Sequence, residues 1–137
     1  MRGCGICAGF CGGLLIGFAI VLSACTSVDD ATFDHYAKKV EQIIFLIHDE
    51  SYDEVVELFS DDLRKELDAK ELREIRPLLD ESGAYESIKK VMVDETEEIT
   101  TKEKIIVTVT TVAYEHKNRT YTLSFNDEDE LVGFYIK

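Results

Sequence analysis

The sequence predicts an α+β domain in which helices come first and an antiparallel sheet follows. Residues 32–48 place apolar side chains at steps of three and four, which is the period of an amphipathic helix. Residues 104–115 are instead dense in β-branched side chains, and residues 120–125 alternate apolar with polar positions. This change of period predicts helices packed on one face of a curved antiparallel sheet.

The first predicted helix has a single apolar stripe that would face the sheet. Its polar positions, such as Asp34, Lys38 and Glu41, lie on the opposite side of the helix. Within residues 32–48 the stripe consists of Phe33, Tyr36, Ala37, Val40, Ile43, Ile44 and Ile47.

Shorter helices are predicted downstream from residues that cap helix N-termini. Ser51 with Glu54, and Asp68 with Glu71, have the spacing of a capping box, in which each side chain bonds the other residue's backbone amide. Ser60 is expected to cap the turn between these two helices. We therefore expect three short helical segments between residue 51 and the sheet.

The remaining helix ends and strands are predicted from helix-breaking residues and from the alternation of apolar and polar side chains. Pro77 is expected to bend or end the last helix, and Gly83 suits its C-terminus. Residues 88–93 are a mixed, strand-like segment, and hairpin turns are expected at residues 116–119 and 126–130. A last strand over residues 131–136 would complete an antiparallel meander.

Composition limits both the size and the partners of the protein. The chain has 137 residues, which suits one domain. It carries 15 Lys and Arg against 28 Asp and Glu, a formal net charge of -13, so its surface repels phosphate backbones. Nucleic-acid binding is therefore not expected, whereas a cationic partner is compatible with the charge.

The N-terminal residues have the layout of a bacterial lipoprotein signal. From Gly3 to Val28 the only ionisable side chains are cysteines, and an apolar run ends in Leu22, Ser23, Ala24 and Cys25. An aliphatic residue, two small residues and a cysteine form the lipobox pattern, in which the cysteine is lipidated after cleavage. We expect residues 1–24 to be an apolar signal helix, residues 25–31 the lipidated cysteine with a short tether, and residues 32–137 the domain.

This interpretation places the domain outside the cell membrane, anchored by lipid. Two acyl chains on Cys25 would make the membrane attachment stable, whereas one would be marginal. The 113 residues left after cleavage carry 14 Lys and Arg against 28 Asp and Glu, a formal charge of -14. Since Cys25 would be their sole cysteine, no disulfide is expected in the domain.

An uncleaved membrane anchor is the alternative. The uncharged run is long enough to cross a bilayer as a helix. It also contains a glycine at every fourth position, a spacing that allows close helix–helix contact and self-association. These glycines are Gly5, Gly9, Gly13 and Gly17. The spacing of Cys4, Cys7 and Cys11 resembles a metal motif, but no second ligand pair completes it, so no metal site is expected.

Short segments of the domain carry a family resemblance. They are residues 59–63 (FSDDL), residues 67–72 (LDAKEL), residues 83–88 (GAYESI) and the ending at residues 131–136 (LVGFYI). Together with the order of helices and strands, they resemble the nuclear-transport-factor-2-like cone. More narrowly, the chain is similar to an uncharacterised family of extracytoplasmic domains in Gram-positive lipoproteins. Members often have a Trp near the position of Pro77, and this chain has none.

The resemblance implies an apolar pocket between sheet and helices, and it carries no catalytic residues over. Isomerase-like chemistry in such a pocket needs a carboxylate base and an oxyanion donor such as tyrosine. Candidate pocket-lining tyrosines are Tyr36, Tyr85, Tyr114, Tyr121 and Tyr135. Tyrosines at these spacings more often pack in a core with the hydroxyl at its edge.

We therefore expect a non-enzymatic binding or accessory lipoprotein without a cofactor or metal. Its partner would be a small apolar ligand or a protein. A small pocket enzyme of isomerase or hydrolase type, and the uncleaved self-associating membrane protein, are the alternatives. His35, His48 and His116 lack ligand spacing, so they are expected on the surface or at helix ends. The acidic residues 126–130 lack the glycine of a calcium loop, so an acidic hairpin turn is expected there.

Overall fold

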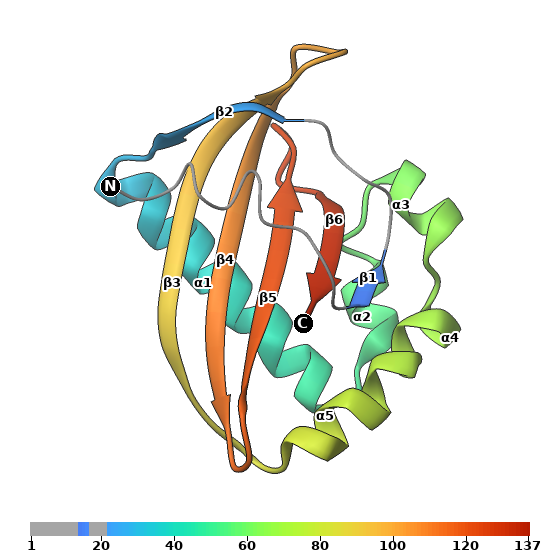
Figure 1. Cartoon of the computed structure of the whole chain (residues 1–137). Coiled ribbons are helices and arrows are strands. Elements are labelled where there is room, and N and C mark those ends of the chain that lie inside the picture. Colours follow the sequence, from blue (N-terminus) through green and yellow to red (C-terminus); the bar gives the residue numbers. More distant parts are fainter. Residues whose placement is uncertain (1–13, 17–21) are drawn as a thin grey trace.

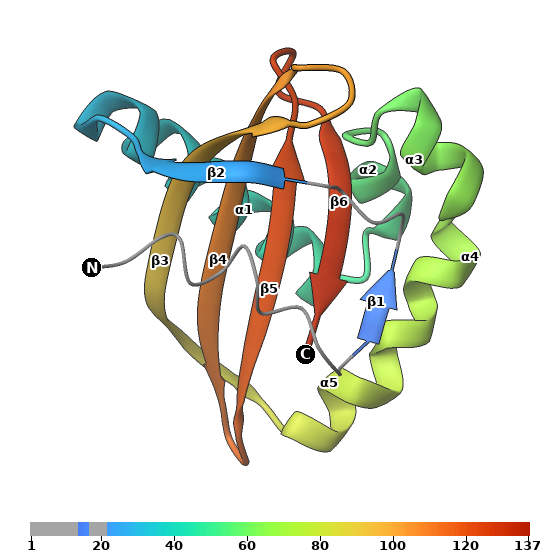
Figure 2. The same cartoon turned by 45° about the horizontal axis from the view of Figure 1, so that its top comes forward.

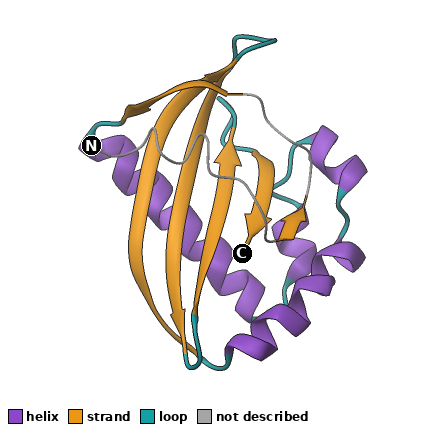
Figure 3. Ribbon diagram, viewed as in Figure 1, coloured by secondary structure: helices purple, strands orange, loops and turns teal. Residues whose placement is uncertain are grey.

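The computed structural model describes residues 14–16 and 22–137 of the chain. Helix α1 comes first in the domain and is followed by a series of short helical segments (Figure 3). Their bounds are α1 (Asp30–His48), α2 (Tyr52–Val56), α3 (Asp61–Glu66), α4 (Ala69–Leu72), the 3-10 turn η2 (Arg73–Ile75) and α5 (Arg76–Ser82).

The strands form one antiparallel sheet in the order β1-β6-β5-β4-β3-β2. The predicted meander is its centre, because β3 to β6 pair in sequence order, and the strands curve around α1 (Figures 1 and 2). The mixed α+β class with helices on a curved antiparallel sheet is thus confirmed. The strands are β1 (Leu14–Ile16), β2 (Leu22–Ser27), β3 (Tyr85–Glu98), β4 (Lys104–Tyr114), β5 (Asn118–Phe125) and β6 (Leu131–Ile136).

Helix α1 buries most of the apolar stripe predicted for it, but Phe33 is exposed and Ala37 is only partly buried. Five members of the stripe are at most 7% exposed, whereas Phe33 is 36% exposed. The helix starts at Asp30, two residues before the predicted start, because the Asp29 carboxylate accepts a hydrogen bond from the Thr32 amide at 2.8 Å. The buried members are Tyr36, Val40, Ile43, Ile44 and Ile47.

Two of the three predicted caps are confirmed. The Ser60 hydroxyl accepts the Leu63 amide, and Asp68 and Glu71 form the reciprocal capping box. The capping box predicted at Ser51 is wrong, because its hydroxyl donates to Asp49 and makes no bond to the helix. A serine next to a competing carboxylate can satisfy its hydroxyl locally, and the spacing alone does not reveal this.

Pro77 and Gly83 bound the last helix as their chemistry requires. Pro77 lies in the first turn of α5, directly after η2, so it bends the chain into a new helix. Gly83 ends α5 with a φ of +89°, a conformation that favours glycine. A Cβ at this position would also lie 2.7 Å from the Cβ of Glu115, so Glu115 leaves no space for a side chain here.

The main core fills the space between α1, the short helices and one face of the sheet. Tyr121, Leu123 and Phe125 alternate inward along β5 and are fully buried. On β6, Phe134 pairs with Leu123 and adds its ring to the same core. The opposite face of the sheet holds a second, smaller cluster of Ile105, Val107, Val109 and Val132.

A buried arginine joins α5 to the sheet. Arg119 on β5 donates to the hydroxyl of Ser82 at 2.6 Å and to the carbonyl of Leu78 at 3.3 Å. It also reaches the carboxylate of Glu81 at 3.2 Å. Since Arg119 is only 8% exposed, these partners satisfy a charge that would otherwise be costly to bury.

The N-terminal prediction of an apolar helix falls mostly outside the described residues. The described pieces of that run, β1 and β2, are strands that pair with the sheet edges β6 and β3. The glycine ladder and Cys4, Cys7 and Cys11 lie outside the described residues. Among the helices of residues 14–16 and 22–137, none has the length and apolar character needed to cross a membrane.

Candidate functional site

A concave groove at one end of the sheet is the candidate site. It has a volume of about 430 Å³. The start of α3, the β3–β4 turn, the β5–β6 turn and the outer face of two strands surround it. The lining residues are Ser60, Asp61, Asp62, Glu98, Thr101, Glu103, Ile105, Asn126, Glu130 and Val132.

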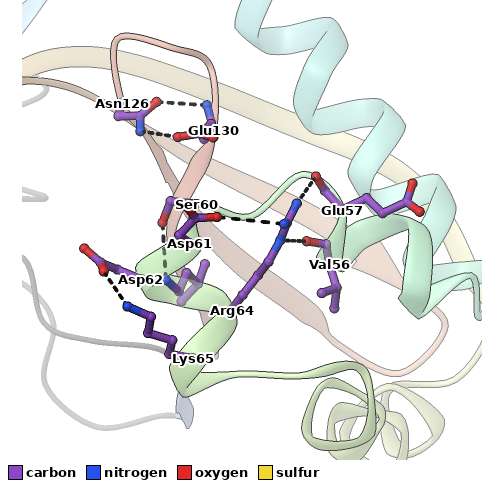
Figure 4. Close-up of polar contacts among 10 residues, drawn as sticks. Val56, Glu57, Ser60, Asp61, Asp62, Arg64, Lys65, Asn126 and Glu130 are labelled. Atoms are coloured by element: carbon purple, nitrogen blue, oxygen red, sulfur yellow. Dashed lines mark hydrogen bonds and ion pairs between the residues drawn. The ribbon is translucent and has the colours of Figure 1, made fainter.

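Backbone hydrogen bonds fix the α3 side of the groove to the last strand. The Ser60 amide donates to the carbonyl of Leu131, and the Leu131 amide donates to the carbonyl of Leu58, both at 2.8 Å. Arg64 of α3 reaches back to the carbonyls of Val56 and Glu57 at 3.2 and 2.9 Å (Figure 4). The bonds to Leu131 and those made by Arg64 therefore hold Asp61 and Asp62 at the rim.

The β5–β6 turn presents Glu130 through its own hydrogen bonds. The side-chain oxygen of Asn126 accepts from the amides of Glu128 and Glu130 at 2.9 and 3.0 Å. Its side-chain nitrogen donates to the Glu130 carboxylate at 3.0 Å (Figure 4). The prediction of an acidic hairpin turn at residues 126–130 is confirmed, and its amide side chain orders it.

The groove combines an acidic rim with an apolar floor. Among the described residues, five carboxylates line it and no Lys or Arg does. Ile105 and Val132, which are 4% and 8% exposed, form the floor. Arg64 and Lys65 only approach Asp61 and Asp62 at 3.9 Å from exposed positions, so they neutralise the rim weakly. Such a surface attracts a cation that also carries apolar groups.

No metal site is evident in the described part of the chain. Within residues 14–16 and 22–137, no three His, Cys, Asp or Glu side chains are grouped so that they could hold a metal ion. The five carboxylates of the groove come from separate segments and are spread along its rim. They therefore suit several positive charges spread over a partner better than a single metal ion.

A second polar cluster lies behind the β5–β6 turn. Asp129 accepts hydrogen bonds from the hydroxyl of Tyr36 at 2.5 Å and from the Nε2 of His35 at 2.7 Å. Burial alone would raise the pKa of Asp129, but these bonds and the charges of His35 and Lys39 outweigh it and lower that pKa. This cluster ties the turn that carries Glu130 to the first turns of α1.

Two of the five predicted pocket tyrosines meet inside the domain. The hydroxyls of Tyr114 and Tyr121 are 2.5 Å apart, and His48 Nε2 lies 2.7 Å from the Tyr114 hydroxyl. Burial raises the pKa of Tyr114 to about 12 and also raises that of Tyr121. Burial, and then the charge of Arg76, lower the pKa of His48, so a neutral ring joins two neutral phenols.

Of the other three predicted tyrosines, only Tyr85 contacts this cluster, with its ring edge-on to that of Tyr114. Tyr85 is 46% exposed and packs its ring on His48, while Tyr36 bonds Asp129 at the turn. Tyr135 pairs with Thr122 and alternates away from the core-facing Phe134. None of the five lines the groove described above.

The residues predicted to form a lipobox lie in β2, which pairs with β3. Leu22 pairs with Glu98 and Cys25 pairs with Thr96, with a register shift between them. Residues 25–31, expected as a tether, are therefore mostly regular structure. Thr26 and Ser27 continue the strand, and α1 starts at Asp30. The signal for this pairing is weak in the sequence, because residues 22–27 lack strand alternation.

Sequence reasoning missed the groove and both histidine clusters. The groove residues come from three separate segments, and the local signals are the adjacent acids Asp61 and Asp62 and the acidic turn at residues 126–130. His35 is exposed and His48 ends α1, as expected, but the sequence did not reveal that each bonds a residue far away along the chain. These partners meet because α1 packs against β4 and the β5–β6 turn.

Comparison with known proteins shows the fold and the family. An NMR structure of a protein from Ruminococcus gnavus ATCC 29149 superposes with a TM-score of 0.65 at 20% identity, over 90% of this chain and 98% of that one. At that identity the likeness shows the fold alone. No curated protein matches the sequence. The model of the family described as "Protein of unknown function (DUF3887)" matches residues 40–134, which is most of the domain. The chain therefore belongs to the DUF3887 family.

Proposed function

We propose that this chain is an extracytoplasmic lipoprotein held in the cell membrane by lipid on Cys25. Leu22, Ser23, Ala24 and Cys25 match the lipobox at all four positions, directly after an apolar run. We also propose that its domain is a nuclear-transport-factor-2-like cone of the kind found in Gram-positive lipoproteins. The order of helices before a curved antiparallel meander supports this assignment.

The domain acts as a non-enzymatic binding module, and the acidic groove is its binding surface. The observation that carries this proposal is the groove's lining, with carboxylates on the rim and Ile105 and Val132 below them. A segment of a partner protein with cationic and apolar side chains complements both parts. With a formal charge of -14 after cleavage, the whole domain would also attract such a partner over distance.

The arrangement inside the domain supports binding over catalysis. Isomerase-type chemistry needs a carboxylate and a tyrosine in one cavity. Tyr114 and Tyr121 instead satisfy each other and His48, and both tyrosines are at most 4% exposed. Tyr36 does meet a carboxylate, that of Asp129, but at a half-exposed turn. These contacts favour packing and stability as the role of the tyrosines.

The anchor is tested by labelling cells with radioactive palmitate. Label is expected in the wild type and absent from the variant Cys25→Ala, because the thiol is the acceptor of the lipid. Label in both proteins would contradict the anchor. The intact mass of the membrane-extracted protein distinguishes an uncleaved anchor, since only the lipoprotein loses residues 1–24.

The groove is tested with a fluorescent peptide that alternates lysine with leucine. The variant Asp62→Asn/Glu103→Gln removes two rim charges and is expected to weaken binding roughly tenfold at low salt, since each exposed charge pair contributes up to ~1 kcal/mol. The matched control, Glu41→Gln/Glu74→Gln, removes two exposed charges outside the groove. Equal losses in both variants would show that only net charge matters and would contradict a binding groove.

A further inference from the structure

The residues between Cys25 and α1 leave no room for a free tether. Cys25, Thr26 and Ser27 pair with Thr96, Glu95 and Asp94 on the edge of β3. Only Val28 and Asp29 then precede α1, and Asp29 is its N-cap. Neighbouring strands lie ~4.8 Å apart, so the backbone of Cys25 lies directly at the sheet edge.

The direction of β2 then fixes which end of the domain lies next to Cys25. Strand β2 is antiparallel to β3, so the chain on the N-terminal side of Cys25 points toward Glu98 and the β3–β4 turn. Ile99 follows three residues after Thr96, the partner of Cys25, which is about 10 Å along a strand. The same end of the sheet carries β2 and the start of α1, whereas α5 lies at the other (Figures 1 and 2).

Exposed apolar side chains flank Cys25 at this end. Ile99, in the β3–β4 turn, is 43% exposed, and Phe33, in the first turn of α1, is 36% exposed. Phe33 lines a shallow groove of about 310 Å³ together with Ser27, the last residue of the strand that contains Cys25, and Val28, which follows it. An apolar side chain on each side of a lipid attachment point is a surface suited to the membrane interface.

We propose that the β2 end of the domain rests on the bilayer that holds the Cys25 lipid, with Ile99 and Phe33 in its interfacial region. This inference relies on the proposed anchoring at Cys25. The orientation places Glu98, Thr101 and Glu103 of the acidic groove beside the membrane, because Glu98 ends β3 and the other two follow in the β3–β4 turn. The groove would then receive a cationic segment that itself lies close to the membrane surface.

The absence of tryptophan from the sequence makes a direct test available. Single reporters are introduced as Ile99→Trp, Phe33→Trp and, as a control, Phe45→Trp in the lipidated mature protein. Phe45 is 65% exposed, more than either proposed contact, and lies ~22 Å along α1 from its start. The proteins are reconstituted in phosphatidylcholine vesicles with acyl chains brominated near the headgroup.

Bromolipid is expected to lower the emission of the reporters at positions 99 and 33 roughly twofold and to leave the control unchanged, because interfacial side chains lie ~5–10 Å deep. Equal quenching at all three positions would overturn the orientation, since it would indicate unspecific adsorption. No quenching in a lipidated, vesicle-bound protein would overturn the inference alone. A protein without lipid on Cys25 would refute the anchoring and the inference with it.

Discussion

Two clusters in this domain use the same kinds of side chain with opposite consequences. His48, Tyr114 and Tyr121 form a buried chain in which all groups are neutral. His35, Tyr36 and Asp129 form a half-exposed cluster around a carboxylate with a lowered pKa. The hydrogen bonds have similar lengths, so their surroundings determine what each cluster contributes. Because the first cluster is buried, it is part of the core. Because the second is half-exposed, it holds the β5–β6 turn to α1 only weakly.

The largest expected difference between the clusters comes from removing a ring. Tyr121→Ala is expected to lower the free energy of unfolding by about 3–5 kcal/mol, because Tyr121 is fully buried and its loss leaves a cavity. His35→Ala in the exposed cluster is expected to cost less than ~1 kcal/mol. Urea denaturation of both variants measures the contrast. Similar losses would show that the two clusters do not differ as their burial suggests.

A smaller difference concerns mild acid. The pKa of His48 is lower in the folded protein than its ordinary value of 6.5, so the unfolded chain binds a proton first as the pH falls. Stability from the neutral ring is present above pH 6.5 and is lost below it. In His48→Gln, unfolding free energies at pH 7 and pH 5 are expected to differ less than in the wild type. An unchanged difference would place the acid sensitivity elsewhere.

The smallest effect is expected at Asp129 and in a lower pH range. Its pKa is below 3.8 in the folded protein, so its contribution is present above that value and is lost as the pH falls through the folded pKa. Asp129→Asn is expected to lower stability by about 0.5–1 kcal/mol at pH 7, and by less at pH 3. Thermal denaturation at both values measures this. The exposed substitution Glu41→Gln serves as control, and an equal loss at both pH values would exclude the charge as the cause.

Periodicity was sufficient to predict most of the framework from the sequence. The stripe on α1 and the alternation on β5 each report which face is buried, and burial of one face is what shapes both patterns. The capping box of Asp68 and Glu71 was equally readable, since both partners lie within one turn. Hydrogen bonds between residues close in sequence can thus be predicted from the residue types and their spacing.

The features that were missed depend on distant partners. Strand β3 runs for 14 residues although charged side chains occupy much of it, because pairing with β4 supplies its backbone bonds. The groove requires α3 to lie beside β6, and the bond from Tyr114 to His48 requires α1 to cross β4. No spacing along the chain encodes these distances. Candidate site residues on separate elements therefore appear only once the sheet is assembled.

The backbone hydrogen bonds that join Leu131 to Leu58 and Ser60 have a consequence for the order of folding. They close a long loop between the helical half and the final strand, and closing a long loop costs chain entropy before any contact offsets it. The α1 helix and the β4–β5 hairpin can form from neighbouring residues, whereas this closure waits for residue 131. During synthesis, a chain whose residues 131–137 are still inside the ribosome can thus form α1 and the β4–β5 hairpin. It cannot complete the groove, because the groove needs β6.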